Sequence, residues 1–183
     1  MILEKLLGTS HARVYRHLAR RLGEGLIEAE VVAATAVSRS AVNVAVRDLT
    51  KAGLIRRQAR GRVGFYSADP ADPVVRQFKV WETTVQLVST VARLVSVARR
   101  VVLYGSAAQG IDTAESDLDL FIVGTDKRAI RQALEPSIDG RRLQAVVVTE
   151  QELASLKSED PVFYAQVREG LVLLEAAAGQ TEP

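Results

Sequence analysis

Apolar residues recur at helical spacing along the first third of the chain. Val14, Leu18 and Leu22 follow one another at intervals of four and lie among arginines, which predicts a first helix over residues 11–21. A segment rich in alanine and valine predicts a second helix over residues 28–36. A glycine-containing turn separates the two segments, so we expect two short helices rather than one long one.

A third helix and a hairpin are predicted next. Ser38 or Ser40 can cap the helix, and Gly53 can end it as a left-handed C-cap. Two extended segments, 54–59 and 65–68, flank a tip that contains two glycines. Such a pattern is typical of a two-stranded hairpin.

A proline-rich connector follows the hairpin. Asp72 can cap a new helix, with Pro73 at its first position. The apolar positions after it predict a long helix over 74–99 with a broad apolar face. We therefore expect a first domain over 1–72, a connecting helix over 73–99, a second domain over 100–176 and a disordered tail over 177–183.

The C-terminal half alternates between strand and helix patterns, which is typical of a mixed sheet flanked by helices. The chain as a whole is therefore predicted to be α/β in class, with a helical first domain. The predicted strands cover 101–104, 118–123, 142–148 and 171–174, and the predicted helices cover 127–134, 150–156 and 161–169.

Charge is distributed unevenly between the two halves. Residues 1–72 carry 12 Lys and Arg against 7 Asp and Glu, whereas residues 73–183 carry 12 against 15. The first part therefore has a net charge of +5 and suits a polyanionic partner, while the second has −3. His11 and His17, the only histidines, are six residues apart and do not share a helical face, so we do not expect a metal site between them.

Composition excludes several other classes of site. The 183 residues include no cysteine, which rules out disulfides and thiolate metal sites. The first eight residues are too few and too charged for a signal peptide, and charges interrupt every apolar stretch of membrane-spanning length. We expect a cytoplasmic protein without a membrane partner.

The segment Val-Ser-Arg-Ser-Ala-Val-Asn-Val-Ala-Val-Arg-Asp-Leu-Thr-Lys-Ala-Gly-Leu-Ile, at 37–55, carries the first family resemblance. Within three helices and a hairpin, it resembles the winged helix-turn-helix domain of bacterial and archaeal transcription regulators, over roughly residues 10–68. The resemblance implies that the third helix enters the major groove of double-stranded DNA, while the hairpin contacts the backbone or minor groove. It also implies a homodimer, because operators with two half-sites match a two-fold axis.

The residues that this resemblance assigns to DNA are outward-facing on the third helix or lie in the hairpin. Arginine and asparagine are the residue types that read guanine and adenine edges, and arginines of the hairpin suit phosphates. The alternatives are a solvated basic face or a module that binds protein. The candidates are Arg39, Ser40, Asn43, Arg47, Lys51, Arg57, Arg60 and Arg62.

Two carboxylates open the predicted strand at 118–123. Asp117 and Asp119 are two residues apart, so on an extended segment both side chains point to the same face. Leu118, Leu120 and Ile122 then point to the opposite face, toward a core. Paired carboxylates repel one another unless a cation lies between them, which favours a divalent metal site for phosphate chemistry.

The spacing of residues around these acids carries the second resemblance. Gly105-Ser106, three residues, Gly110, five residues and Ser116-Asp117-x-Asp119 match the signature of the DNA polymerase β-type nucleotidyltransferases. The match is most similar to the minimal nucleotidyltransferases and extends from about Val101 to Leu174. A P-loop ATPase is not supported, because the chain has no Walker-type Gly-Lys-Ser/Thr loop.

This resemblance implies a nucleotide site with a catalytic metal. Gly105, Ser106, Gly110 and Ser116 would bind the nucleotide, and the two aspartates would act as catalytic ligands of Mg²⁺ or Mn²⁺. The family reaction is transfer of a nucleoside monophosphate from an NTP to a hydroxyl, here that of a protein acceptor or a small molecule.

The chain departs from the family pattern at one position. Active members carry a third carboxylate on the next core strand, where this chain has Gln144, and glutamine cannot act as a general base. Asp139 and Glu150, at the two ends of that strand, are the possible substitutes. Two hypotheses follow: a nucleotidyltransferase fused to a DNA-binding domain, or a regulator whose degenerate transferase domain senses nucleotide or mediates dimerisation.

Overall fold

The computed structural model describes residues 7–176, and the chain divides into two compact units. The first unit comprises the chain up to Glu82 together with the loop Gly110–Ala114, and the second comprises Thr83–Gln109 and the chain from Glu115 onward. Helix α5 (Pro73–Leu94) contributes residues to both units. The predicted tail at 177–183 lies outside the described residues.

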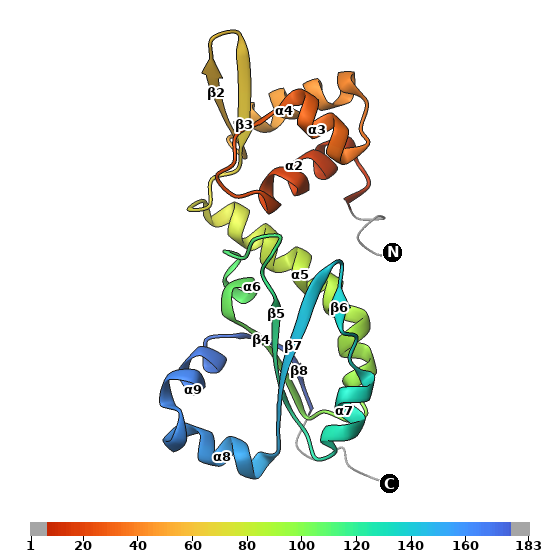
Figure 1. Ribbon diagram of the computed structural model, residues 1–183, viewed down its shortest axis with the longest axis vertical. Coiled ribbons are helices and arrows are strands. Elements are labelled where there is room, and N and C mark those ends of the chain that lie inside the picture. The colour runs from red at the N-terminus through yellow and green to blue at the C-terminus, as the bar shows by residue number, and fades with distance from the viewer. Residues whose placement is uncertain (1–6, 177–183) are drawn as a thin grey trace. The chain divides into compact units, whose positions relative to one another are not determined.

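The first unit has the element order of a winged helix-turn-helix domain (Figure 1). One helix and a short strand are followed by two helices and a hairpin, and the three strands form an antiparallel sheet in the order β1-β3-β2. The fold predicted for this region is therefore confirmed. Its elements are α2 (Ser10–Arg20), β1 (Leu26–Ile27), α3 (Glu28–Thr35), α4 (Arg39–Lys51), β2 (Arg56–Arg60) and β3 (Val63–Ser67).

Local signals in the sequence define helix α4. The side chain of Ser38 accepts a hydrogen bond from the backbone N–H of Ala41 at 3.4 Å, so Ser38 rather than Ser40 is the N-cap. Gly53 adopts the left-handed conformation with φ +76°, which ends the helix as predicted. The two-residue strand β1 was not predicted, because its pairing with Tyr66 and Phe65 depends on residues distant in sequence.

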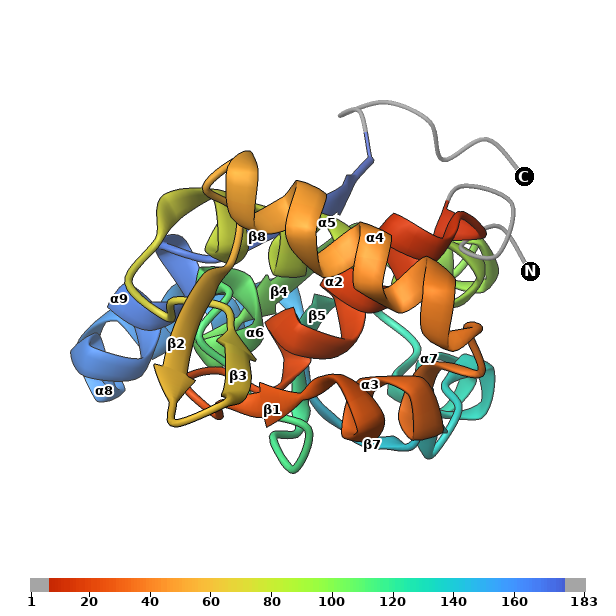
Figure 2. The same cartoon turned by 90° about the horizontal axis from the view of Figure 1, so that it is seen from above.

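A compact apolar core joins the three helices to the sheet. The side chains of Val14, Leu18, Val31 and Val42 are fully buried, and Tyr66 from the hairpin packs with them. The α2, α3 and α4 ribbons cluster around this core with the hairpin beside them (Figure 2). The predicted helical stripe is confirmed at Val14 and Leu18, whereas Leu22 lies beyond the end of α2 and is only partly buried.

The loop Gly110–Ala114 is anchored on helix α5 within the first unit. The Nζ atom of Lys79 lies 3.1 Å from the carboxylate of Asp112 and also donates to the carbonyl oxygen of Asp112. The Lys79 and Asp112 side chains are 3% and 5% exposed, so the ion pair is fully buried. A Cβ atom at Gly110 would lie 2.2 Å from the carbonyl oxygen of Arg76, so only glycine fits this approach.

The second unit contains a five-stranded mixed sheet in the order β6-β7-β5-β4-β8. Strands β5 and β7 are parallel, and the other neighbouring pairs are antiparallel. This arrangement confirms the predicted mixed sheet flanked by helices. Its elements after α5 are β4 (Arg100–Tyr104), α6 (Gly105–Gln109), β5 (Leu118–Val123), α7 (Lys127–Ala133), β6 (Ser137–Ile138), β7 (Arg141–Val148), α8 (Glu150–Glu159), α9 (Pro161–Arg168) and β8 (Leu171–Glu175).

Each face of the sheet has its own apolar cluster. Leu118, Leu120 and Ile122 pack with Leu87 and Leu94 of α5 on one face, where α7 also lies. Phe121 and Val123 pack on the other face against residues of α8 and α9. Figure 1 shows the ribbons of these two helices on the side of the sheet opposite α7. The predicted burial of the three apolar residues of β5 on one face is therefore confirmed.

Three elements after the hairpin also differ from the sequence-based prediction. Helix α5 ends at Leu94 rather than near residue 99, because the N–H groups of Val97 and Ala98 turn back to the Leu94 carbonyl and Ala98 enters the core. The segment after Gly105 forms the short helix α6 rather than an irregular excursion, and β6 was not predicted.

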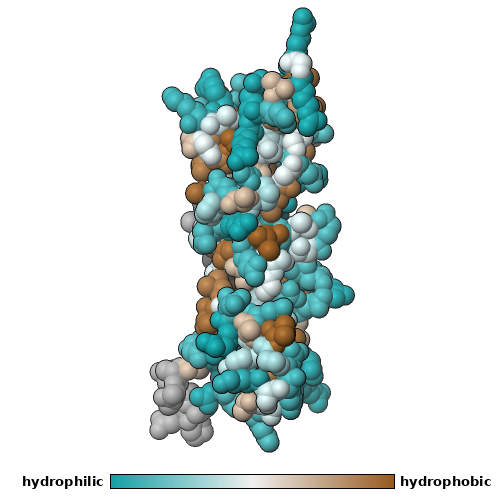
Figure 3. Space-filling model, turned by 90° about the vertical axis from the view of Figure 1, so that its left-hand side faces the viewer, coloured by the Kyte–Doolittle hydropathy of each residue, from teal (hydrophilic) through white to brown (hydrophobic). Residues whose placement is uncertain are grey.

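Hydrophilic side chains dominate the face drawn in Figure 3, as expected for helices whose outer sides contact water.

The buried Lys79–Asp112 pair gives a first prediction. Asp112→Ala leaves the Lys79 ammonium buried without its carboxylate, so we expect a loss of about 3–5 kcal/mol in the free energy of unfolding. The double variant Lys79→Met/Asp112→Ala removes both charges and should recover most of that loss. Urea denaturation of the four proteins of this cycle measures the coupling.

Glu24→Ala is the matched control, because it removes one partner of the exposed Arg21–Glu24 pair. Its effect should stay within about 0.5 kcal/mol. Simple additivity of the two single substitutions at 79 and 112 would contradict the assignment of a buried, mutually dependent pair.

Candidate functional site

The two predicted acids lie where strand β5 begins. Asp119 is the second residue of β5, and Asp117 precedes the strand by one residue. Asp119 pairs in register with Tyr104 of β4 on one side and with Gln144 of β7 on the other. Both acids are partly buried, so they remain accessible to a ligand. We refer to Tyr104, Gly105, Asp117, Asp119 and Gln144 as the carboxylate site.

Gly105 meets Asp119 directly at the end of β4. It has φ +71°, and a Cβ atom there would lie 2.8 Å from the Oδ2 atom of Asp119. Any larger residue would be strained by its backbone angle and would also displace the carboxylate. The structure therefore brings these two predicted residues together and explains why glycine is required.

Gln144 occupies the position of the missing third acid. Its Nε2 amide donates a hydrogen bond to Oδ2 of Asp117, and the guanidinium of Arg142 lies 3.5 Å from the same oxygen. The neighbouring strand thus presents two hydrogen-bond donors to Asp117 where a carboxylate would present acceptors. One oxygen of Asp117 is already engaged by groups of the protein.

The electrostatics of the site favour a cation. Partial burial raises the pKa of Asp119, and the nearby negative charge of Asp117 raises it further. The pKa of Tyr104 is also raised, first by burial and then by the charge of Asp119. A positive ion beside the two carboxylates would relieve this repulsion.

Of the other predicted nucleotide contacts, two lie in the same unit as the acids and one does not. Ser106 lies in the first turn of α6, and both Ser106 and Ser116 are partly buried in the same unit as the two acids. Gly110 belongs to the first unit through its contact with Arg76, so the structure does not group it with them.

Neither possible substitute for the third acid joins the carboxylate site. Asp139 lies in the turn between β6 and β7, where it accepts a hydrogen bond from Gln86 at 2.8 Å. Glu150 begins α8 and lies 3.5 Å from Arg99. Across residues 7–176, no group of three or more His, Cys, Asp or Glu residues is arranged to hold a metal ion.

Two carboxylates nevertheless fit one particular mode of metal binding. Mg²⁺ is commonly held by one or two protein carboxylates together with substrate phosphates and water. Asp119 and the remaining oxygen of Asp117 match that donor set. A second ion would need a further carboxylate, and Gln144 supplies a neutral amide instead.

The residues predicted to contact DNA are all exposed. On α4 the side chain of Asn43 donates to Glu28 at 3.1 Å, and Arg47 lies 3.5 Å from Asp48. In the hairpin, the guanidinium of Arg60 lies 4.8 Å from the centre of the Phe65 ring. The exposed set comprises Arg39, Ser40, Asn43, Arg47, Lys51, Arg57, Arg60 and Arg62.

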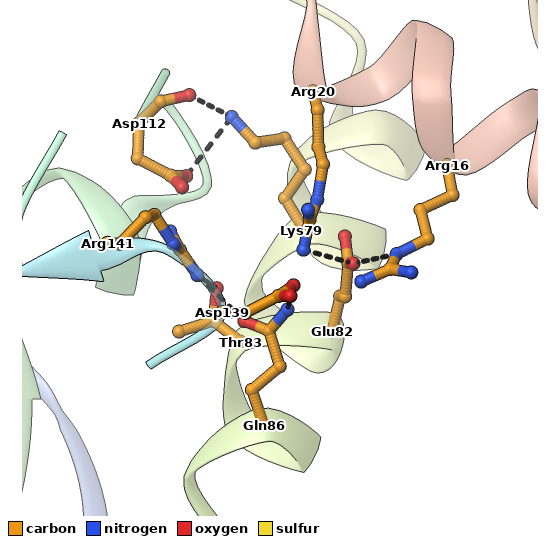
Figure 4. Close-up of polar contacts among 9 residues, drawn as sticks. All are labelled: Arg16, Arg20, Lys79, Glu82, Thr83, Gln86, Asp112, Asp139 and Arg141. Atoms are coloured by element: carbon orange, nitrogen blue, oxygen red, sulfur yellow. Dashed lines mark hydrogen bonds and ion pairs between the residues drawn. The ribbon is translucent and has the colours of Figure 1, made fainter. Parts of the chain in front are cut away.

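Sequence reasoning did not single out Tyr104, Arg142, Lys79 or Asp112. Strand alternation could have found Tyr104, because it directly precedes Gly105 and shares a face with Val102. Alternation likewise places Arg142 on the same side of β7 as Gln144. The Lys79–Asp112 pair, drawn in Figure 4, joins residues 33 positions apart, and no local pattern predicts it.

The solved structures that resemble this chain are only distantly similar to it in sequence. No curated protein matches the sequence. The predicted DNA-binding transcriptional regulator from E. coli is 21% identical, with 46% of this chain and 85% of that chain covered at a TM-score of 0.35. The archaeal chromatin protein TrmBL2, whose structure is described as showing a novel mode of DNA binding, is 18% identical, with 92% and 73% covered at a TM-score of 0.32.

The family comparison is specific to the second unit and to α5. The family described as "Polymerase beta, Nucleotidyltransferase" matches residues 87–178, which is half of the chain. Members of this family generally use divalent metal ions. The match spans Gly105, both aspartates of the carboxylate site and the strand that carries Gln144. With this motif on the mixed sheet described above, the chain belongs to the polymerase beta nucleotidyltransferase family.

Proposed function

We propose that this protein is a DNA-binding regulator whose nucleotidyltransferase domain binds an NTP together with one divalent metal ion and does not transfer the nucleotide. The observation that carries this proposal is Gln144. It lies in register with Asp119, donates to Asp117 and replaces the acid that would activate an attacking hydroxyl.

Nucleotide binding is supported by the residues that remain intact. Gly105 leaves room for a close approach at the end of β4, and Ser106 offers a hydroxyl beside it. Asp117 and Asp119 would hold the ion that neutralises the phosphates of the nucleotide. The pKa of Asp119 is raised first by burial and then by the charge of Asp117, and such an ion would relieve the repulsion between the two acids.

Loss of transfer is supported by the hydrogen bond from Gln144 and by the charge of Arg142. An amide cannot take the proton from an acceptor hydroxyl. The guanidinium 3.5 Å from Asp117 supplies a positive charge without the open coordination positions of a metal. Transfer to a protein or small-molecule hydroxyl is the second candidate, because the Gly-Ser and Asp-x-Asp elements match the family signature.

DNA binding is supported by the winged-helix fold and by the charge of its exposed residues. Helix α4 and the hairpin carry five cations between Lys51 and Arg62 without an acid among them. Arg47 and Asn43 are suited to base edges, and Arg57, Arg60 and Arg62 are suited to phosphates. We further propose a homodimer that places two α4 helices on operator half-sites.

The nucleotide proposal predicts metal-dependent binding that Asp119→Asn weakens. Isothermal titration calorimetry with ATP, GTP, CTP and UTP should detect binding in Mg²⁺ or Mn²⁺ and lose it in EDTA. The variant should bind at least tenfold more weakly, because one of two metal ligands is neutral. Asp139→Asn, which changes a carboxylate in the turn between β6 and β7 outside the site, should bind as the wild type does.

The same samples separate binding from transfer. We expect no pyrophosphate release above the Asp119→Asn background from the wild type. Release that depends on Asp119 would favour the second candidate, and absence of binding to every NTP would overturn both.

The raised pKa of Asp119 predicts a pH-dependent gain in stability on substitution. Above that pKa the ionised side chain destabilises the folded state, because it is partly buried beside Asp117. Asp119→Asn should therefore raise the melting temperature of the metal-free protein at pH 7. The difference should shrink as pH falls through the pKa of Asp119, where the wild-type side chain is already neutral. A lower melting temperature for the variant at pH 7 would contradict this account.

The DNA proposal predicts that Arg47 of α4 contacts a base of the bound duplex. Arg47→Gln should weaken binding to a duplex selected by the wild-type protein from a random pool by about 1–3 kcal/mol, as expected for a base contact. Fluorescence anisotropy at fixed salt measures the effect. Arg131→Gln, an exposed arginine of α7, is the matched control and should leave affinity unchanged. Equal affinities for both variants would show that α4 does not contact DNA.

A further inference from the structure

Glu28 joins three elements of the first unit through its two carboxylate oxygens. It is the first residue of α3, which begins where β1 ends, and β1 lies beside β3 (Figure 2). Its Oε2 atom accepts a hydrogen bond from Nδ2 of Asn43 on α4 at 3.1 Å. Its Oε1 atom accepts from the hydroxyl of Tyr66 on β3 at 3.2 Å. One side chain of α3 therefore contacts both α4 and the hairpin, the two elements that carry the proposed DNA contacts.

The hydrogen bond from Tyr66 holds the carboxylate of Glu28 in place. Tyr66 is only 6% exposed and belongs to the apolar core, so its hydroxyl is a fixed donor. Glu28 itself is partly buried, and its place in the first turn of α3 favours a negative charge. A carboxylate that is bonded through one oxygen and partly shielded from water presents its second oxygen in a defined direction. That second oxygen is the one that contacts Asn43.

The carboxylate partner decides which way the amide of Asn43 points. Ionised carboxylate oxygens only accept hydrogen bonds, so the amide nitrogen has to face Glu28. The amide oxygen of Asn43 then faces away from Glu28, on a side chain that is exposed to solvent. The amide nitrogen keeps a second hydrogen, because the bond to Glu28 uses only one. Asn43 therefore offers a ligand one acceptor and one donor in a fixed arrangement.

We propose that Glu28 is a positioning residue for base recognition, which holds the Asn43 amide so that its oxygen accepts from the exocyclic amine of a base in the major groove. This inference rests on the DNA binding proposed above. Adenine and cytosine carry such an amine on their major-groove edges, whereas guanine and thymine present acceptors there. Adenine also presents N7 as an acceptor for the second amide hydrogen, so a bidentate contact favours adenine.

The charge of Glu28 argues against a role in affinity alone. The hairpin that it contacts carries cations suited to DNA phosphates, and an acid close to them lowers the attraction for the DNA backbone. A base contact through Asn43 instead raises the affinity for one sequence relative to others. Glu28 should therefore increase discrimination between sequences while it lowers the affinity for DNA of any sequence.

The hydrogen bond can be measured without DNA, because Asn43 is the only asparagine of the chain. Selective ¹⁵N-asparagine labelling gives a single side-chain amide in the NMR spectrum. Glu28→Ala should shift the proton resonances of that amide, and Glu28→Gln should shift them less, because the glutamine oxygen can still accept. Glu24→Ala, which removes an exposed acid of the same unit, is the matched control and should leave them unchanged. Resonances that do not respond to Glu28→Ala would overturn the inference.

The role in recognition is tested with duplexes that lack one exocyclic amine. In the duplex that the wild-type protein selects from a random pool, each adenine is replaced in turn by purine and each cytosine by 2-pyrimidinone. We expect one position at which loss of the amine weakens wild-type binding by about 5- to 150-fold, as for a bidentate base contact. Asn43→Ala should be insensitive to the same replacement. Sensitivity to purine identifies adenine as the base, and sensitivity to 2-pyrimidinone identifies cytosine.

Variants of Glu28 separate positioning from simple effects of charge or stability. Glu28→Ala should lose most of the discrimination at the position that Asn43 reads, yet bind a random-sequence duplex at least as tightly as the wild type. Glu28→Gln and Glu24→Ala should both retain that discrimination. Equal discrimination by the wild type and Glu28→Ala would overturn the inference, and so would a loss that Glu28→Gln does not restore. A parallel loss of specific and random-sequence binding, with a lower melting temperature, would make Glu28 merely structural and overturn it as well.

Failure of this inference and failure of the DNA proposal give different results. If the wild type binds no duplex at low salt, the DNA proposal fails and this inference fails with it. If the wild type selects a duplex but every amine-deficient replacement affects the wild type and Asn43→Ala equally, DNA binding stands and the inference alone fails.

Discussion

The alternation of strand β5 is the constraint on which the second unit depends. Leu118, Leu120 and Ile122 enter one apolar cluster while Asp119 and Phe121 face the other side. A shift of one residue would bury the carboxylate in the apolar cluster beside α5, so the core itself fixes where the acids lie. The pairing register of β5 with its two neighbouring strands then places Asp119 between Tyr104 and Gln144. Packing of the apolar residues of β5 thus determines where the acids of the carboxylate site lie. The chemistry of the site depends on a few side chains at the strand ends.

The exchange of an acid for Gln144 changes the character of that site. A carboxylate there would bind cations together with Asp117, whereas the amide and Arg142 both donate toward Asp117. The hydrogen bond from Gln144 and the charge of Arg142 therefore replace part of the positive charge that a second ion would place beside Asp117. Under the proposed function, such a site would attract one ion and the phosphates that accompany it, while the step that consumes a nucleotide would lack its base.

Much of the fold could be predicted from local sequence, because helices and strands with one buried face follow simple periodicities. The three helices, the hairpin and four of the five strands of the mixed sheet were predicted this way, as was the burial of Leu118, Leu120 and Ile122. The Asp-x-Asp spacing and Gly105 likewise predicted neighbours that the structure brings together. Prediction failed where tertiary contacts decide: the pairing of β1 with β3, the end of α5 at Leu94, the buried Lys79–Asp112 pair and the hydrogen bond from Gln144 to Asp117. None of these follows from periodicity: three of them join residues far apart in the chain, and the end of α5 depends on the turn in which the N–H groups of Val97 and Ala98 bond to the Leu94 carbonyl.

The assignment of the Gly110–Ala114 loop to the first unit has a practical consequence for anyone who dissects this protein. Cutting the chain in α5, between the residues of the two units, would leave the loop on one fragment and Lys79 on the other. The nucleotidyltransferase fragment would then carry a carboxylate, Asp112, whose ammonium partner has been removed, and Gly110 without the backbone that it touches. A single cut in the sequence therefore does not separate the two units, and a fragment that contains the whole first unit must include the loop Gly110–Ala114.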